Sequence, residues 1–246
     1  MSSLLQVKNL SKRFDDVQAV DNFSFDIKSG EILGLVGPNG AGKTTLIRCI
    51  CGILKMDSGN VKINNLDLIK DGSTARGKLG YVSETPNPYD YLTVWEHIMF
   101  IMRAYSINAW ERRAEEMLKR FDLIEKRDDM VVTLSKGMKQ KLTIICTFLH
   151  DPEIFLLDEP IIGIDPKGTK YLKELVKKGQ KDGKAILISS HMLDLIEKLC
   201  TRIIIMDNGK KLVQGEISFL RKQARLGLDS SFEETFIKIT EGDSDI

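Results

Sequence analysis

The stretch Gly37-Pro38-Asn39-Gly40-Ala41-Gly42-Lys43-Thr44 decides the fold, because it matches the phosphate-binding pattern G-x-x-x-x-G-K-[ST]. It follows an apolar run, residues 31–36, that reads as a buried strand, and it precedes a helix-forming run that begins at Thr45. The glycines let successive backbone N–H groups curl toward phosphate oxygens, and the following helix presents the positive end of its dipole. We therefore predict that Gly37 to Thr45 bind a nucleoside triphosphate, with Lys43 reaching the phosphates and the Thr44 hydroxyl holding Mg2+. The alternative, a glycine-rich turn that happens to carry a lysine, does not require this strand and helix context.

Length and composition are those of an ordinary globular protein. The 246 residues suffice for a full core, and we expect one domain of the α/β class. The net charge of +1 offers no general attraction to nucleic acid, so no nucleic-acid partner is expected. The sequence shows neither a signal-peptide core nor an apolar run long enough to cross a bilayer, which predicts a soluble, cytoplasmic protein. The four cysteines lack zinc-ligand spacing and are expected to be buried thiols.

The first two thirds of the chain change from a β pattern to a helical one. Short β-type runs at residues 5–10, 23–27 and 59–64 predict an antiparallel start. Between residues 85 and 150, apolar side chains recur at helical spacing after a turn rich in Pro, Asn and Asp. This part is predicted to be an inserted helical subdomain.

The last third returns to strands. Two strongly apolar runs, residues 154–157 and 185–188, flank a charged helical segment, which is the strand-helix-strand unit of a parallel sheet. A third run, residues 202–206, ends in Asp207-Asn208-Gly209, a strong hairpin signal. Ser231 to Glu234 fits a capping box that opens a short final helix.

Two adjacent acids follow the strand at 154–157. Asp158 falls at the carboxyl end of that strand, where open α/β sheets bind ligands, so Asp158 is the predicted Mg2+ ligand, directly or through water. Glu159 is placed to accept a proton from, or to orient, the water that attacks the γ-phosphate. Pro160 biases Glu159 toward an extended backbone. The alternative is that the two acids only cap the next turn.

Two further segments gain meaning from their position. His191 follows the strand at 185–188 and thus shares a carboxyl strand end with Asp158, which favours a γ-phosphate or water contact over an ordinary surface or core histidine. Ser135, in Leu134-Ser135-Lys136-Gly137-Met138, could be only the N-cap of the amphipathic helix that follows. The order of phosphate loop, helical subdomain, this segment and acidic strand end indicates a functional role instead.

In this order the motifs resemble those of the nucleotide-binding subunits of ATP-binding-cassette (ABC) transporters, over about residues 4–215. The resemblance covers the first nucleotide motif (Gly37–Thr44), the signature (Leu134–Met138), the second nucleotide motif (Ile154–Glu159), the dimer-contact loop (Ile162–Asp165) and the switch histidine (His191). It implies a P-loop NTPase fold with an ABC-type parallel-sheet core, an antiparallel β subdomain and a helical subdomain at about 85–150. It also implies an ABC ATPase domain at 1–220, followed by a short C-terminal helix and tail at 221–246.

The resemblance implies a second nucleotide-binding subunit, either an identical copy or a paralogue. Two such domains pack head to tail in the family. Ser135 and Gly137 of one subunit would therefore bind the γ-phosphate held by the other subunit, through Gly40, Lys43 and Thr44 of that subunit. On this reading a single chain does not complete a site.

The resemblance also implies a separate integral membrane permease. A cytoplasmic helix of the permease would dock on the surface after Glu84, which includes Tyr89, Tyr91 and the helix that begins near Val94. The chain would then lie peripherally on the inner face of the cell membrane. The alternative is that these aromatic and methionine side chains are plain core.

At three positions the residue differs from the usual family residue or allows a second interpretation. Glu84 stands where the family usually has glutamine; both side chains can ligate Mg2+, so Glu84 is assigned a catalytic and metal-binding role, with extra negative charge beside the γ-phosphate. Phe14 aligns with the aromatic that stacks on adenine, and a core phenylalanine is the equal alternative. Lys136 replaces a signature glycine, and this form resembles the exporter branch, of ABC-2 type, that includes drug, sodium and polysaccharide efflux systems; a solvated surface lysine is the alternative.

Together these features predict an ATP-binding and ATP-hydrolysing subunit of an ABC exporter, driven by ATP-dependent dimerisation. The alternative is a soluble ABC-type ATPase not coupled to transport, whose relatives usually carry a coiled-coil insertion or two cassettes. A GTPase would need an Asn-Lys-x-Asp motif, which is absent, and a small-molecule kinase would not need residues 135–138. A regulator without turnover would not need Glu159.

Overall fold

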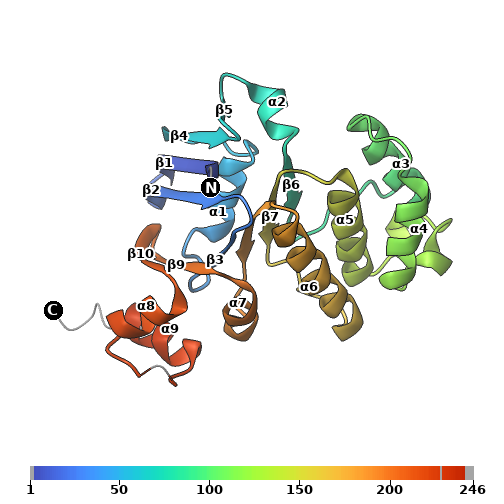
Figure 1. The fold of residues 1–246 in the computed structure, drawn as a ribbon. Helices are drawn as coiled ribbons and strands as arrows, with labels where there is room; N and C mark the ends of the chain where they lie inside the picture. The colour runs from blue at the N-terminus through green and yellow to red at the C-terminus, as the bar shows by residue number, and fades with distance from the viewer. Residues whose placement is uncertain (1–2, 228, 242–246) are drawn as a thin grey trace.

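The computed structural model describes residues 3–227 and 229–241, which form two sheets with helices around them (Figure 1). A six-stranded sheet has the order β10-β9-β3-β8-β7-β6, and a four-stranded antiparallel sheet has the order β2-β1-β4-β5. Figure 1 shows the antiparallel sheet on one side of the six-stranded sheet and helices α3, α4 and α5 on the other. The predicted α/β class, with an antiparallel part and an inserted helical part, is confirmed.

The six-stranded sheet is the centre of the molecule. Its parallel strands are β3 (Ile32–Val36), β6 (Leu79–Val82), β7 (Ile154–Asp158), β8 (Ala185–Ser189) and β9 (Arg202–Asp207). Every residue of β3, β7 and β8 is buried, because helices or the second sheet cover both faces. Each fully buried Leu, Ile or Val side chain contributes about 1.5–3 kcal/mol. These apolar runs therefore fix the strand ends, where the predicted site residues lie.

Helix α1 (Lys43–Ile50) contacts strands of both sheets, so the phosphate loop that precedes it lies at their junction. The antiparallel sheet consists of β1 (Ser3–Phe14), β2 (Val17–Lys28), β4 (Ser58–Ile63) and β5 (Leu66–Asp67), followed by the short helix α2 (Gly72–Arg76). On β1, Leu5, Val7 and Leu10 point into the core.

The helical part comprises α3 (Val94–Ala104), α4 (Glu111–Arg120) and α5 (Lys136–His150), with 3-10 turns η1 (Ile124–Lys126) and η2 (Val131–Thr133). Helix α3 begins with a complete capping box between Thr93 and Glu96. The longer helix α5 packs against both α3 and β6, so it joins this part to the central sheet.

The C-terminal part begins with helices that return to the sheet. Helix α6 (Pro166–Lys181) is the predicted charged helix between β7 and β8, and α7 (Leu193–Leu199) joins β8 to β9. The hairpin between β9 and β10 (Lys210–Gly215) turns at Asn208 and Gly209, whose φ angles are 45° and 77°, as the sequence predicted.

Two last helices, α8 (Ile217–Gln223) and α9 (Phe232–Glu241), pack against each other and α9 contacts α7. The predicted capping box of α9 is present, since Ser231 and Glu234 exchange side-chain to backbone hydrogen bonds. The boundary predicted at residue 220, between the ATPase domain and the C-terminal helix and tail, falls inside α8. This division into two parts remains a prediction.

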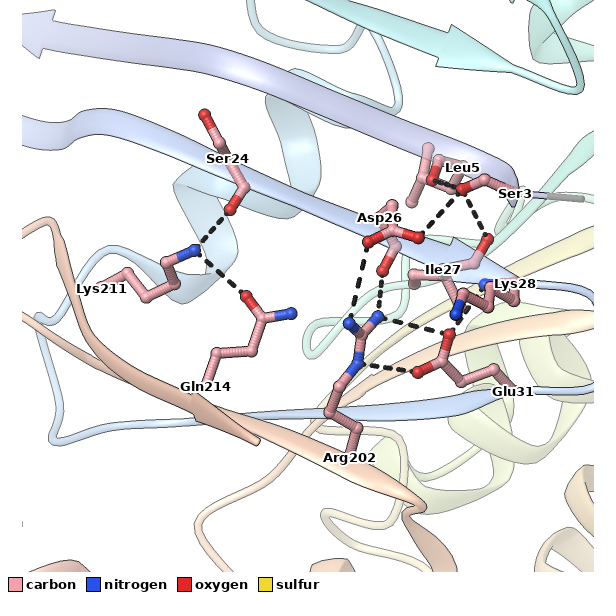
Figure 2. Close-up of polar contacts among 10 residues, drawn as sticks. All are labelled: Ser3, Leu5, Ser24, Asp26, Ile27, Lys28, Glu31, Arg202, Lys211 and Gln214. Carbon is pink, nitrogen blue, oxygen red and sulfur yellow. Dashed lines mark hydrogen bonds and ion pairs between the residues drawn. The ribbon is translucent and has the colours of Figure 1, made fainter. Parts of the chain in front are cut away.

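Arg202 ties the two sheets together (Figure 2). From the start of β9 its guanidinium pairs with Glu31 at 2.8 Å and donates to the backbone oxygen of Asp26 at 2.5 Å. Asp26 belongs to β2, and Glu31 immediately precedes β3. Nearby, Lys211 of β10 donates to the backbone oxygen of Ser24 at 2.7 Å. The last strands of the central sheet are therefore fastened to the antiparallel sheet.

Within the described residues, no helix combines the length and apolar character needed to span a bilayer. The four cysteines are buried and free of disulfides, as predicted.

Candidate functional site

The phosphate loop connects β3 to α1 and is folded by its glycines. Gly40 and Gly42 have φ angles of 81° and 102°, in the region that favours glycine. A Cβ on Gly42 would lie 2.1 Å from the backbone oxygen of Ala19, and a Cβ on Gly37 would lie 2.1 Å from that of Met206. The loop thus packs closely between β2 and the end of β9. A larger residue at Gly37 or Gly42 would displace the loop from these strands.

Lys43 folds back over this loop. Its Nζ donates to the backbone oxygens of Gly37 at 2.6 Å and Pro38 at 3.0 Å. Burial lowers the pKa of Lys43, while the nearby carboxylates of Glu159, Asp158 and Glu84 act in the opposite direction. The ammonium therefore lies inside the loop with three acids close by.

Asp158 ends β7 and is almost fully buried, with 1% of its surface exposed. Its Oδ1 accepts a hydrogen bond from Ser189 Oγ at 2.7 Å, while Oδ2 has no partner within the described part of the chain. Burial raises the pKa of Asp158, and the side chains of Ser189 and Thr44 oppose the rise. A buried carboxylate oxygen without a donor is costly, and a cation beside it would relieve that cost.

Glu159 and His191 form a pair at the ends of β7 and β8. The distance between His191 Nδ1 and Glu159 Oε2 is 2.8 Å, and the His191 backbone N–H also donates to this oxygen at 3.3 Å. The extended backbone predicted for Glu159 is wrong, because its φ is 47°. Its N–H donates to the hydroxyl and the backbone oxygen of Ser189, at 3.0 and 3.2 Å, and these bonds outweigh the local bias of Pro160. Holding a non-glycine residue at positive φ costs about 1–3 kcal/mol, which these hydrogen bonds to β8 help to offset.

A cavity of 590 Å³ brings most of the predicted residues together. Its lining includes Asn39 to Thr45, Glu84, Glu159 and His191. Asp158 lies behind this lining, under Thr44 and Ser189. Of the predicted strand-end cluster, Glu159 and His191 therefore share one cavity with the phosphate loop, while Asp158 is buried next to it.

Several lining residues were not predicted as nucleotide contacts: Val17, Gln18, Ala19, Asn208, Gly209 and Ile162, the last of which the sequence assigned only to the dimer-contact loop. The Gly209 N–H donates to the backbone oxygen of Ala41 at 3.0 Å, which seats the β9–β10 turn on the phosphate loop. The Asn208-Gly209 signal was recognised only as a hairpin turn. Nothing local in the sequence relates that turn to residues 17–19.

Six predicted site residues lie outside the lining of this cavity: Gly37 and Pro38 at the start of the phosphate loop, Asp158, Phe14, Ser135 and Gly137. Phe14 is 44% exposed, so it is not a core residue, and its strand partner Val17 lines the cavity instead. Ser135 is exposed and caps α5, accepting from the N–H of Met138 at 3.2 Å. Gly137 packs so tightly that a Cβ would lie 2.0 Å from the backbone oxygen of Gly163.

A phosphate loop on the central strand of a parallel sheet, facing a buried aspartate and a Glu–His pair, defines a P-loop nucleoside triphosphatase. The family model described as ABC transporter matches residues 20–162. The chain belongs to the ABC transporter family.

Two relatives show how far the similarity extends. The ABC-type transporter ATP-binding protein EcsA of Bacillus subtilis (strain 168) is 34% identical over 244 residues, covering 98% of both chains. The Nod factor export ATP-binding protein I of Burkholderia pseudomallei (strain 1710b) is 33% identical over 227 residues, covering 92% of this chain and 74% of the relative.

Solved structures agree with this assignment. The structure of an ATP-binding subunit of an ABC transporter matches with a TM-score of 0.92 and 34% identity, over 96% of this chain and 99% of that one. The dimeric structure of a post-hydrolysis state of an ATP-binding cassette bound to ADP and Pi matches with a TM-score of 0.76 and 26% identity, over 86% and 98%. The chain is thus an ATP-binding subunit of an ABC transporter, and it hydrolyses ATP.

Proposed function

We propose that this chain drives a membrane exporter by binding ATP between two nucleotide-binding subunits and then hydrolysing it. The position of Ser135 and Gly137 carries the proposal. These residues stand at the exposed tip of α5, outside the cavity lined by their own phosphate loop. A second subunit turned head to tail would bring its own α5 tip to this nucleotide. The dimeric form of the related ATP-binding cassette supports this arrangement.

We propose that the γ-phosphate side of the cavity holds Mg2+ through the Thr44 hydroxyl, Asp158 and Glu84. The unpartnered Oδ2 of Asp158 and the oxygen character of all three donors fit this ion. Within residues 3–227 and 229–241, no group of three or more His, Cys, Asp or Glu side chains could hold a metal ion alone. A metal that takes its remaining ligands from phosphates and water fits that finding. When bound, Mg2+ would neutralise charge on the phosphate oxygens.

The remaining roles, phosphate binding and activation of the attacking water, fall to Lys43, Glu159 and His191. Lys43 supplies positive charge to the phosphates once it leaves the two carbonyl oxygens it now contacts. Glu159 orients the attacking water and accepts its proton. His191 holds the Glu159 carboxylate in place through Oε2 and faces the γ-phosphate from the other strand end. Neither Glu159 nor His191 would need to move far, since the cavity already contains both.

The proposed permease surface is the face around Tyr89 and Tyr91. Tyr91 is 87% exposed and Tyr89 57% exposed, so neither is a core residue. Tyr89 packs edge-on against Phe100 of α3, with ring centroids 5.1 Å apart, and lines a separate cleft of 450 Å³ between α3, α5 and β6. An exposed aromatic cleft of this kind fits a helix supplied by a membrane subunit. Such a partner would hold the chain peripherally at the cytoplasmic face of the membrane.

The direction of transport is proposed as export. Lys136 and the segment after it have the form seen in the exporter branch, and one relative is named as a Nod factor export protein.

The adenine contact is proposed to include Phe14, which is exposed at the end of β1 next to the cavity-lining strand β2.

Glu159→Gln tests the proposed cycle. This variant should bind ATP, hydrolyse it slowly and associate into a dimer in the presence of ATP and Mg2+, because the amide keeps the shape of the carboxylate but accepts no proton. Size-exclusion chromatography with and without ATP measures the association. A species that stays monomeric at all ATP concentrations would contradict the two-subunit site.

Isolation of the native protein from detergent-solubilised host membranes distinguishes transport from a soluble ABC-type ATPase. A co-purifying multi-span protein supports transport, and its absence supports the soluble alternative.

A further inference from the structure

Gln140 connects the segments that carry Glu84 and Glu159, the two carboxylates to which the sequence assigned a catalytic role. It lies in the second turn of α5 with 1% of its surface exposed. Its Nε2 donates to the backbone oxygen of Ser83 at 3.1 Å and to that of Pro160 at 3.4 Å. Ser83 immediately precedes Glu84, and Pro160 immediately follows Glu159. One side chain therefore joins the ends of two neighbouring strands, β6 and β7.

The chemistry of these contacts fixes the orientation of the Gln140 amide. Both neighbours are carbonyl oxygens, which only accept, so the –NH2 group must face them. The amide oxygen Oε1 is then left buried with no partner among the residues that the structure describes. A buried oxygen without a donor destabilises the fold. Gln140 is therefore poorly suited as a purely stabilising residue, and its two donated hydrogen bonds are its distinctive contribution.

The helix that carries Gln140 also carries the exposed tip. Ser135 caps α5, and Gly137 lies in its first turn against the backbone of Gly163. One residue after Gln140, Lys141 pairs with Asp165 at 2.6 Å and is itself buried. The first two turns of α5 are thus held as a unit against the 162–165 loop.

We propose that Gln140 is a positioning residue that transmits the arrangement of the Glu84 and Glu159 loops to the tip of α5. This inference rests on the proposed two-subunit function, because the tip of α5 matters for catalysis only if it contacts a second subunit's nucleotide. When ATP occupies the cavity, it fixes the loops that carry Glu84 and Glu159. The two hydrogen bonds of the Gln140 amide then fix the position of α5 relative to both loops. Ser135 and Gly137 are thereby oriented to contact the γ-phosphate bound by the other subunit.

Gln140→Met in the full chain is the test. Methionine has a similar length, removes both donated hydrogen bonds and removes the unpartnered oxygen. We expect an unchanged melting temperature and unchanged ATP affinity of the monomer, because the phosphate loop is untouched. The kcat should fall about tenfold, which corresponds to about 1.4 kcal/mol in the activation free energy. In a Glu159→Gln background, the protein concentration needed for ATP-driven association should rise about tenfold.

Two further variants separate positioning from simple anchoring. Gln140→Glu keeps the shape but places an acceptor against two carbonyl oxygens, so kcat and association should fall at least as far as in Gln140→Met. Thr147→Val is the matched control. The single O–H of Thr147 is shared between the backbone oxygens of Thr143 at 2.8 Å and Tyr81 at 3.3 Å, so Thr147 too lies between α5 and β6, but two turns further from the site. Thr147→Val should keep kcat and association within twofold of the wild type.

The outcomes distinguish the inference from the function on which it rests. If Glu159→Gln associates with ATP and the added Gln140→Met changes neither association nor the kcat of the otherwise wild-type chain, the role of Gln140 is refuted. Equal losses in Thr147→Val and Gln140→Met also refute it, because they would show general anchoring of α5. If the Glu159→Gln parent does not associate at all, the two-subunit function itself fails, and the role of Gln140 fails with it.

Discussion

Ser189→Ala should reveal how strongly the two strand ends depend on one buried hydroxyl. Ser189 has no exposed surface, and its Oγ both donates to Asp158 Oδ1 and accepts from the Glu159 N–H, at 2.7 and 3.0 Å. The Glu159 N–H keeps a second acceptor, the Ser189 backbone oxygen, after the substitution. The Asp158 carboxylate keeps only the Thr44 side chain as a neighbouring donor, because within the described residues its Oδ2 has no hydrogen-bond partner by distance and angle.

The magnitude follows from the lost bond to Asp158. A hydrogen bond to a charged group contributes about 1.5–3 kcal/mol, so we expect the free energy of unfolding to fall by about 2 kcal/mol. For a chain of this length, that fall lowers the melting temperature by about 4–8 °C. The substitution should also slow ATP hydrolysis, because Glu159 loses one of the two bonds that hold its backbone at positive φ.

Thermal unfolding without nucleotide, followed by circular dichroism or calorimetry, measures the stability change. Ser190→Ala is the matched control: Ser190 is equally buried, its hydroxyl accepts from the Met192 N–H, and among the described residues it makes no hydrogen bond to Asp158 or Glu159. Its melting temperature should fall less, and its ATPase rate should stay closer to the wild type. Equal melting temperatures for wild type and Ser189→Ala would refute the importance assigned to this hydroxyl.

Three other substitutions test separate features of the chain. Lys43→Ala should abolish detectable ATP binding by isothermal calorimetry, and an unchanged affinity would contradict the role of the loop lysine. Glu84→Gln should retain ATP turnover within a few-fold, because an amide oxygen can also ligate Mg2+; complete loss of turnover would mean that the carboxylate has a role of its own. For His97, burial lowers the pKa to about 4, so the unfolded chain binds the proton more readily between about pH 6.5 and pH 4, and stability falls as the pH drops through that window. Between pH 7 and pH 5 the wild type should lose about 2 kcal/mol more than His97→Gln in urea unfolding, and parallel losses would contradict this burial effect.

The sequence predicted those parts of the fold whose signals are local. The phosphate loop, with the buried strand before it and the helix after it, and the Asn208-Gly209 hairpin turn depend on residue types at fixed short spacing, and these features are present. Asp158, Glu159 and His191 could be grouped because parallel strands align their carboxyl ends.

The parts that escaped prediction depend on contacts between distant segments. Ser189 gave no signal, since no pattern at the end of an apolar strand assigns a serine hydrogen bonds to the Asp158 carboxylate and the Glu159 backbone N–H. The backbone of Glu159 was predicted from Pro160 alone, whereas hydrogen bonds to β8 determine it. Gln140 was recognised only as the end of the signature segment that begins at Leu134, and the packing of α5 on β6 is what shows the contacts of its amide.

The strand order has a consequence for biosynthesis. Strand β3, which leads into the phosphate loop, is flanked in the sheet by β8 and β9, and both come from the last third of the chain. Ribosomes add about 5–20 residues per second, so the nascent β3 waits on the order of ten seconds before either neighbour exists. During that interval the edges of β3 lack their native partners, which exposes the strand to wrong pairing until the last third of the chain is made.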